Sequence, residues 1–207
     1  PSRGLGDVYK RQGQVKVNTV QLDSVVRKVF NSRAHTERTL DINVSAIAKL
    51  TNGEAISVAG ATQAKLTPVV TPEISEEGYY MLGDFQEQSS GKKWDEKNPV
   101  VMEKIGDGLY KATVTTVAAT SYFKFFRAYD TTNPNWDVDI NPGELGTVID
   151  GDLATENFLV WRNDPSCAAV KSPAISGINE YIVTLDMINM TFKVAIKTYD
   201  LFMTGSN

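Results

Sequence analysis

Residues 181–196 read Tyr-Ile-Val-Thr-Leu-Asp-Met-Ile-Asn-Met-Thr-Phe-Lys-Val-Ala-Ile, and this stretch decides the fold class. Its first half places Tyr181, Val183 and Leu185 on one face, because side chains alternate along a strand. Its second half offers matching apolar residues beyond a turn at residues 187–189, namely Phe192, Val194 and Ile196. The pattern predicts an antiparallel hairpin with one buried face.

Short strand-like runs precede this hairpin in the sequence. They lie at residues 79–82, 109–115, 122–126 and 158–161, and a helical period is absent from this part of the sequence. Two long polar stretches, residues 86–98 and 130–156, are expected to be loops. We therefore predict an antiparallel β-sandwich module over residues 78–199.

An acidic connector with a proline precedes this module, and residues 73–77 form its linker. Upstream, an apolar stripe predicts a short amphipathic helix at residues 22–30. Strands are expected at residues 40–48, 56–58 and 66–70, with Pro68 marking an edge or a bulge and Asn52-Gly53 a turn. This part has only about sixty residues, whereas a whole sandwich needs roughly 100. Residues 13–72 are therefore expected to be the C-terminal part of a sandwich domain.

Both ends of the chain carry distinct signals. The segment Tyr-Tyr-Met-Leu-Gly-Asp-Phe at residues 79–85 returns in degenerate form at residues 200–207, which predicts the start of a truncated second module. Residues 1–12 have no apolar period and look like translated adapter sequence. We expect these twelve residues to lie outside the fold.

Composition limits the classes of function. The net charge of -4 and the pI near 5.1 argue against nucleic-acid binding, and no apolar run is long enough to span a membrane. The single Cys167 cannot form an internal disulfide and is expected to be a buried free thiol, and His35 a solvated loop residue. The carboxylates that start at Asp137 do not match a calcium loop, because position twelve is Val148. We therefore expect neither a metal nor a cofactor.

The tryptophans suggest a binding site. Trp94 and Trp136 lie in polar loops. A large ring in such a loop either caps the core or forms an exposed platform, and both alternatives stay open. Trp161 lies in an apolar run and is expected in the core. The apolar face of a sugar ring stacks on indole, and its hydroxyls need polar partners. The hypothesis is a glycan site centred on Trp136, with these further members: Trp94, Tyr129, Arg127, Asn135 and Asp137.

Two alternatives accompany this hypothesis. Arg127 could instead pair with a nearby carboxylate. A carboxylate pair for glycoside hydrolysis could come from Asp84, Asp130 or Asp137, although a module of about 120 residues is small for a glycosidase.

The order of the motifs carries a family resemblance. From about residue 18 onward the chain resembles the SusE/SusF family. The motifs that carry the resemblance are, in order, residues 79–85, a loop tryptophan, Met102 before Gly-Asp-Gly-Leu-Tyr at 106–110, Tyr-Phe-Lys-Phe-Phe at 122–126 and the closing hairpin. The resemblance implies an all-β chain: a partial immunoglobulin-like sandwich over residues 13–72, followed by a carbohydrate-binding-type antiparallel β-sandwich. One departure is that Trp94 comes later than the Asn-Gly-Trp of the family pattern.

The resemblance also implies a function. Members are surface-exposed, starch-binding outer-membrane lipoproteins, so it implies non-catalytic binding of starch or a related polysaccharide beside an outer-membrane glycan transporter. The lipid anchor is absent from this sequence, because Cys167 is interior and cannot carry it. The alternatives are an accessory β-domain of a larger glycoside hydrolase and a purely structural spacer.

Deleting residues 1–12 should leave the melting temperature unchanged, because these residues are expected to pack against nothing. The measurement is a thermal unfolding scan of the full and shortened chains. A drop of several degrees, worth about 1 kcal/mol for a domain of this size, would show that the segment belongs to the fold.

Overall fold

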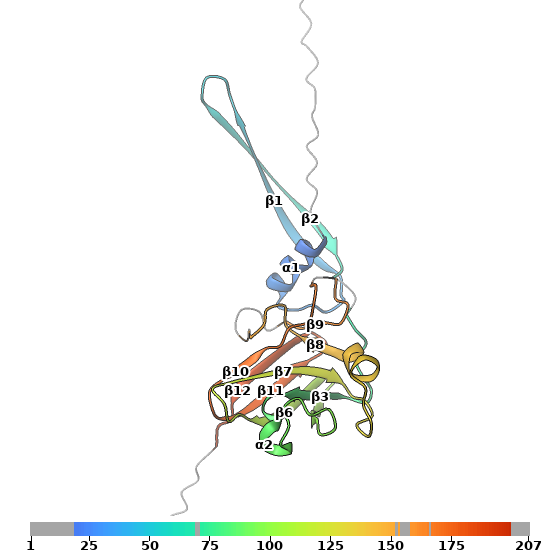
Figure 1. The fold of residues 1–207 in the computed structure, drawn as a ribbon. Coiled ribbons are helices and arrows are strands. Elements are labelled where there is room, and N and C mark those ends of the chain that lie inside the picture. Colours follow the sequence, from blue (N-terminus) through green and yellow to red (C-terminus); the bar gives the residue numbers. More distant parts are fainter. Residues whose placement is uncertain (1–18, 69–70, 152, 154–157, 166, 200–207) are drawn as a thin grey trace, which may run out of the picture.

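The computed structural model describes residues 19–68, 71–151, 153, 158–165 and 167–199 (Figure 1). Most of the regular secondary structure of these residues is antiparallel strand, which confirms the predicted all-β class. A helix and a long hairpin form the N-terminal part, and a two-sheet sandwich forms the rest (Figure 1). The two terminal segments singled out in the sequence, residues 1–12 and 200–207, lie outside the described residues.

Helix α1 (Thr19–Phe30) confirms the helix predicted from the apolar stripe. Val26 is fully buried, whereas Val25 and Val29 are 46% and 63% exposed. The helix therefore buries only part of its apolar stripe within the described chain.

Strands β1 (Arg38–Lys49) and β2 (Ala55–Leu66) pair along their whole length, from Arg38 opposite Leu66 to Lys49 opposite Ala55. The predicted turn between them is confirmed, with Gly53 at a φ of +88°. Strand structure at residues 56–58 is confirmed, but the division into two strands was wrong, because β2 is continuous and ends at Leu66. Residues 69–70 of the second expected strand lie outside the described residues. Pairing with β1 supplies the hydrogen bonds that the small and polar residues of β2 would not favour alone.

The sandwich consists of two antiparallel sheets. The first has the order β4 (Val100–Val101), β3 (Tyr79–Gly83), β7 (Thr120–Arg127), β8 (Glu144–Gly146) and β9 (Val160–Trp161), and β10 (Ala174–Ser176) also pairs with β7. The second has the order β12 (Thr191–Ile196), β11 (Glu180–Asp186), β6 (Leu109–Thr115) and β5 (Glu103–Gly106).

The predicted hairpin is confirmed, since Val183 pairs with Val194 and Leu185 with Phe192. Five of its six predicted apolar residues join the main core between the sheets, whose aromatic centre is Phe123, Phe125 and Phe192. The exception is Ile196 at the end of the hairpin, which is exposed. The Phe123 and Phe125 rings meet edge to face at 5.4 Å. Each buried side chain of this size contributes about 1.5–3 kcal/mol of transfer free energy, so this core is the main stabilising element of the sandwich.

Strand β7 also faces a second, smaller cluster on the outer side of its sheet. Phe126 follows the inward-facing Phe125 and points the opposite way, because neighbouring strand residues alternate. Leu82 and Ile140 are buried with it. This outer cluster positions the candidate site described below.

The two stretches expected to be loops contain strand β8 and three short helices, so that prediction was wrong in part. The helices are α2 (Gln86–Ser90), the π-helix η1 (Trp136–Ile140) and the 3-10 helix η2 (Asn141–Gly143). A single turn is too short to show a helical period in the sequence. Val138 and Ile140 alternate like strand residues, yet they lie in η1, where the Asn135 side chain caps the first turn.

Arg33 ties the N-terminal part to the sandwich. Its side chain is 1% exposed, and its guanidinium donates to Asp164 Oδ2 at 2.9 Å and to Asp23 Oδ2 at 3.3 Å. The same group donates to the carbonyl of Leu159 at 2.9 Å and lies 4.8 Å from the centre of the Trp161 ring. Since Asp23 belongs to α1 and the other partners to the sandwich, one buried cation joins the two.

Three single-residue expectations have clear outcomes. His35 is exposed in a loop, as predicted, and its Nδ1 lies 2.7 Å from the carbonyl oxygen of Pro68. Cys167 is a free thiol, but it is half-buried rather than buried, and that burial raises its pKa. Trp161 packs against the main core from its edge and is partly exposed.

Replacing Arg33 with Met should lower the free energy of unfolding by about 3–5 kcal/mol, because it removes one partner of two buried ion pairs. The matched control is Lys65→Ala, whose ion pair with Glu37 is 69% and 58% exposed and should contribute about 0–1 kcal/mol. Urea denaturation measures both. Equal losses for the two variants would contradict the structural role of Arg33.

Candidate functional site

Three partly exposed aromatic residues gather on the outer cluster of the first sheet. Trp94, Tyr129 and Trp136 all pack against the buried residues Leu82, Phe126 and Ile140. They come from three different segments: the loop after α2, the loop after β7 and the start of η1. Each ring therefore caps the cluster with one part and leaves another part open to solvent.

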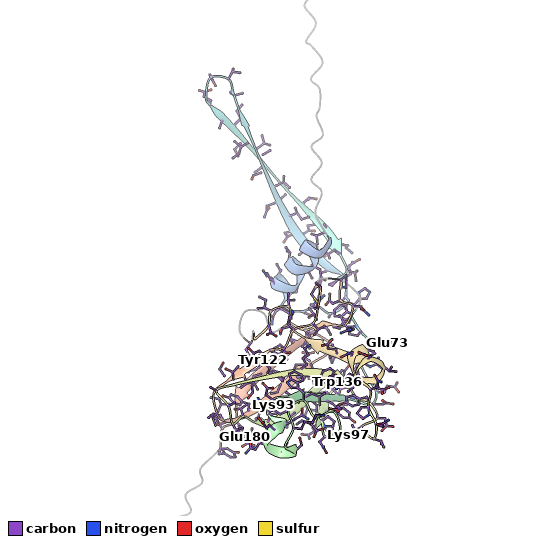
Figure 2. All side chains as sticks on the ribbon, viewed as in Figure 1. Glu73, Lys93, Lys97, Tyr122, Trp136 and Glu180 are labelled. Atoms are coloured by element: carbon purple, nitrogen blue, oxygen red, sulfur yellow. The ribbon has the colours of Figure 1, made fainter. Side chains whose placement is uncertain are left out.

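Trp136 stands at the start of η1 on the sandwich, which Figure 2 shows below the hairpin. Its ring meets Phe126 edge to face at 6.0 Å. The side-chain oxygen of Asn135 accepts hydrogen bonds from the backbone of Asp137 at 2.9 Å and of Val138 at 3.3 Å, so Asn135 fixes the turn that presents Trp136. π-Helical turns are rare and often occur at functional sites.

Asp137 is an exposed neighbour of Trp136. Its Oδ1 accepts a hydrogen bond from Asn141 Nδ2 at 3.3 Å, and the carboxylate remains on the surface. Among the sequence-predicted polar partners, Asn135 and Asp137 thus flank Trp136 in the same turn.

Trp94 is held in a strained backbone conformation, with a φ of +52°. A bulky residue adopts this left-handed region at a cost on the order of 1–3 kcal/mol, and such strain persists only where the surroundings impose it. The backbone N–H of Trp94 donates to the carbonyl of Gly83 at 3.1 Å, and its indole Nε1 donates to Asp84 Oδ1 at 3.0 Å. The protein therefore fixes both the peptide and the ring of Trp94.

Tyr129 is the third aromatic residue of the outer cluster, and it also contacts the loop that carries Trp94. Its hydroxyl donates to the carbonyl of Glu96 at 2.9 Å, and its ring meets Tyr80 edge to face at 5.2 Å. Burial raises the pKa of Tyr129, and the negative charge of Glu96 adds to the effect. The phenol therefore stays neutral across the physiological range and keeps its role as a donor.

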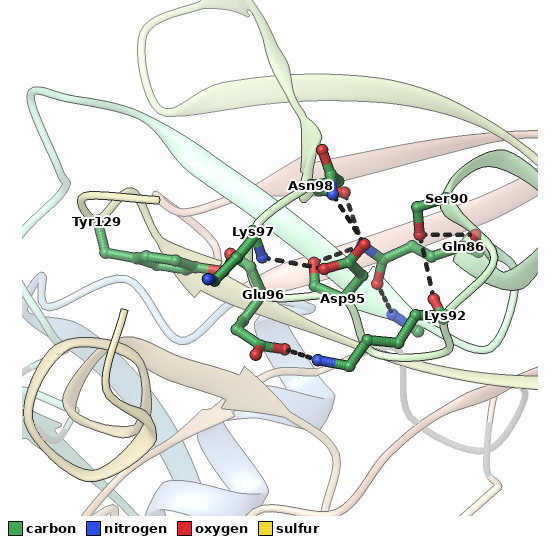
Figure 3. A network of polar contacts seen from close by, with 9 residues as sticks. Gln86, Ser90, Lys92, Asp95, Glu96, Lys97, Asn98 and Tyr129 are labelled. Atoms are coloured by element: carbon green, nitrogen blue, oxygen red, sulfur yellow. Dashed lines mark hydrogen bonds and ion pairs between the residues drawn. The ribbon is translucent and has the colours of Figure 1, made fainter. Parts of the chain in front are cut away.

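The loop that carries Trp94, residues 91–98, is held by polar contacts (Figure 3). Lys92 Nζ pairs with Glu96 Oε2 at 2.6 Å, and this contact lowers the pKa of Glu96. Asn98 Nδ2 donates to Asp95 Oδ2 at 2.8 Å, and that hydrogen bond lowers the pKa of Asp95. Both carboxylates are therefore ionised at neutral pH, and the loop is closed in that state.

Arg127 lies apart from this aromatic face. It follows Phe126 on β7, so it faces the opposite side of the strand. Its side chain lines a small cavity together with Tyr79 and Glu73, near the linker that precedes the sandwich. Of the six residues predicted from the sequence, the fold brings Trp94, Tyr129 and Trp136 together on one cluster. Asn135 and Asp137 accompany Trp136 as its neighbours in the chain, and Arg127 lies apart.

Cations that the sequence reasoning missed lie on the outer face instead. Lys124 Nζ pairs with the carboxylate of Glu144 and donates to the carbonyl of Val170 at 3.0 Å. Arg162 Nη1 shares Glu144 through its Oε2 at 3.2 Å, and the Arg162 side chain is 51% exposed. The alternation of β7 could have indicated Lys124, which lies on the same face as Phe126.

The carboxylates considered for hydrolysis have structural partners. Asp84 accepts from the indole of Trp94 and from the backbone N–H of Tyr122 at 3.1 Å. Asp130 Oδ1 accepts from the backbone of Thr132 at 2.9 Å, and this bond lowers the pKa of Asp130. Within the described ranges, no cluster of three metal-ligating side chains occurs, and no helix is both long and apolar enough to cross a membrane.

Comparison with known families decides the relationship. Residues 73–196 match the family described as SusF, first starch specific CBM. Residues 7–68 match the family described as Outer membrane protein SusF, N-terminal domain.

The chain belongs to the SusE/SusF family. It is 34% identical over 196 residues to the outer membrane protein SusF of Bacteroides thetaiotaomicron, an alignment that covers 92% of this chain and 37% of that protein. The crystal structure of SusF from the same organism is similar with a TM-score of 0.67 and 29% identity, covering 84% of this chain and 36% of that one. The chain therefore spans a little over a third of the SusF chains that it matches.

Proposed function

We propose that this chain binds starch or a related polysaccharide without hydrolysing it, as part of a glycan-uptake system at the cell surface. The observation that carries the proposal is the shared outer cluster of Trp94, Tyr129 and Trp136, in a region that matches the starch-specific module of SusF. Three partly exposed aromatic residues on one cluster provide apolar ring surface on which sugar rings can stack.

The chemistry of the face suits a polysaccharide. The apolar faces of successive sugar rings would stack on the two indoles, while the hydroxyls at their edges need donors and acceptors. Asp137 and Asn135 lie beside Trp136 and would serve these hydroxyls. On the same side of the sheet, the half-exposed guanidinium of Arg162 is the cation that we propose in place of Arg127.

The relatives suggest where the protein works. The matched relative is named an outer membrane protein, and the N-terminal match carries the same description. We therefore place this protein at the outer membrane, exposed on the surface and held by a lipid anchor of the full-length protein. Its partner in this proposal is an outer-membrane glycan transporter, to which captured polysaccharide would pass.

Residues 13–72 would then belong to an N-terminal immunoglobulin-like domain, residues 73–77 to a linker and residues 78–199 to one carbohydrate-binding module. The support is the change from hairpin to sandwich at this point and the two separate family matches. Residues 200–207 would open a further module of the same kind.

Replacing Trp136 or Trp94 with Ala should abolish most of the retardation of the protein in a native gel that contains soluble starch. Since the Trp136 ring is only partly buried, its loss should cost less than the roughly 3–5 kcal/mol of a fully buried tryptophan. Trp161→Phe is the control, because Trp161 packs beside Arg33 and the main core. Lost stability with unchanged retardation of the folded variants would make these rings core caps and favour the spacer alternative.

Replacing Arg162 with Ala should weaken starch binding by about tenfold or more, whereas Arg127→Ala should leave it within about twofold. A hydrogen bond from a charged donor contributes about 1.5–3 kcal/mol only where it reaches the ligand. Isothermal titration with soluble starch measures both. The opposite order would return Arg127 to the binding site and remove Arg162 from it.

A further inference from the structure

Gln86 is a fully buried amide beneath the loop that carries Trp94. It is the first residue of α2 and 0% exposed. Its Oε1 accepts from the backbone N–H of Gly83 at 2.9 Å, and its Nε2 donates to the carbonyls of Asp95 at 2.9 Å and Asn98 at 2.8 Å. Figure 3 shows this network.

These hydrogen bonds enclose Trp94. The backbone of Gly83 is held at both ends. Its N–H donates to Gln86, and its carbonyl oxygen accepts from the N–H of Trp94 at 3.1 Å. The next residue, Asp95, is held through its carbonyl by the same amide. The strained φ of +52° at Trp94 therefore lies between two points that Gln86 fixes.

The chemistry of this position requires a carboxamide. One acceptor faces an N–H group and two donors face carbonyl oxygens, which is the inventory of a glutamine side chain. A carboxylate would direct oxygen at two carbonyls, and an apolar side chain would leave all three backbone groups without this partner. At the surface, the Asn98 amide completes the network by donating to Asp95 Oδ2 at 2.8 Å.

We propose that Gln86, with the Asp95–Asn98 closure, is the positioning element that sets the Trp94 ring for glycan binding. The inference rests on the proposed function and extends it to a residue that never touches the glycan. Binding is stronger when the platform is ordered before the ligand arrives. If the loop spent only a tenth of its time in the binding conformation, the apparent affinity would fall by about tenfold.

The test uses the full chain with Gln86→Met, a substitution of similar length that removes the hydrogen bonds. Gln88→Ala is the matched control, because Gln88 lies on the same helix and is exposed. Val114→Ala is a second control, since Val114 is buried in β6, outside the outer cluster, and its loss lowers stability without touching the loop. Titration with soluble starch gives the affinity, and fluorine NMR of 5-fluorotryptophan-labelled protein reports each indole separately.

The expected result for Gln86→Met is about tenfold weaker starch binding and a shifted or broadened signal for Trp94 alone. Gln88→Ala and Val114→Ala should bind like the parent chain. An unchanged affinity and an unchanged Trp94 signal in Gln86→Met would overturn the proposal. So would an equal loss of affinity in Val114→Ala, because the effect would then follow stability rather than position.

Two further outcomes separate this proposal from the proposed function and from a failure to fold. If Trp94→Ala and Trp136→Ala both bind starch like the parent, the proposed function fails at this face; a Trp94 signal that still moves in Gln86→Met keeps the positioning role of the amide. If Gln86→Met does not fold, Asn98→Ala decides, because it opens the same loop from its exposed end. A Trp94 signal and an affinity that stay at parent values in Asn98→Ala would then reject the proposal.

Discussion

The alternation of side chains along β7 is the constraint on which both the main core and the outer aromatic cluster depend. Phe123 and Phe125 enter the main core, and Phe126 supports the outer aromatic cluster. Strands β3, β8 and β10 all pair with β7, so its register sets theirs. A slip of one residue would exchange the two faces and expose the core aromatics, so the packing of the core and the presentation of the platform are specified together.

The candidate site is built from irregular segments on this regular support. Trp94 sits in a left-handed conformation, and Trp136 opens a π-helical turn. Neither conformation is favourable in isolation, and both are held by polar contacts, from Gly83 and Asp84 in one case and from Asn135 in the other. Binding residues on loops above a rigid sheet are a common arrangement, because the sheet fixes position while the loop provides shape.

The N-terminal part depends on a different kind of interaction. Its hairpin is largely exposed, with Val44 at 52% and Val58 at 64%, so its own packing stabilises it little. Arg33 instead anchors α1 to the sandwich through two buried carboxylates and the Trp161 ring. Buried ion pairs require good geometry at both ends, which makes this contact more valuable for fixing orientation than for adding stability.

Elements with local signals could be predicted from the amino-acid sequence. The hairpin at residues 181–196, the helix at residues 22–30 and the Asn52-Gly53 turn follow from period and turn chemistry, and the polar setting of Trp94 and Trp136 marked them as candidates. The helices α2 and η1 could not be predicted, because a single turn is too short to show a helical period. Which cations share the outer face, and the burial of Arg33, became clear only from the folded chain. These two features depend on partners far apart in the chain, such as Arg33 with Asp164 and Lys124 with Glu144. Contacts of that separation leave no period in the sequence, because they exist only after the strands have paired.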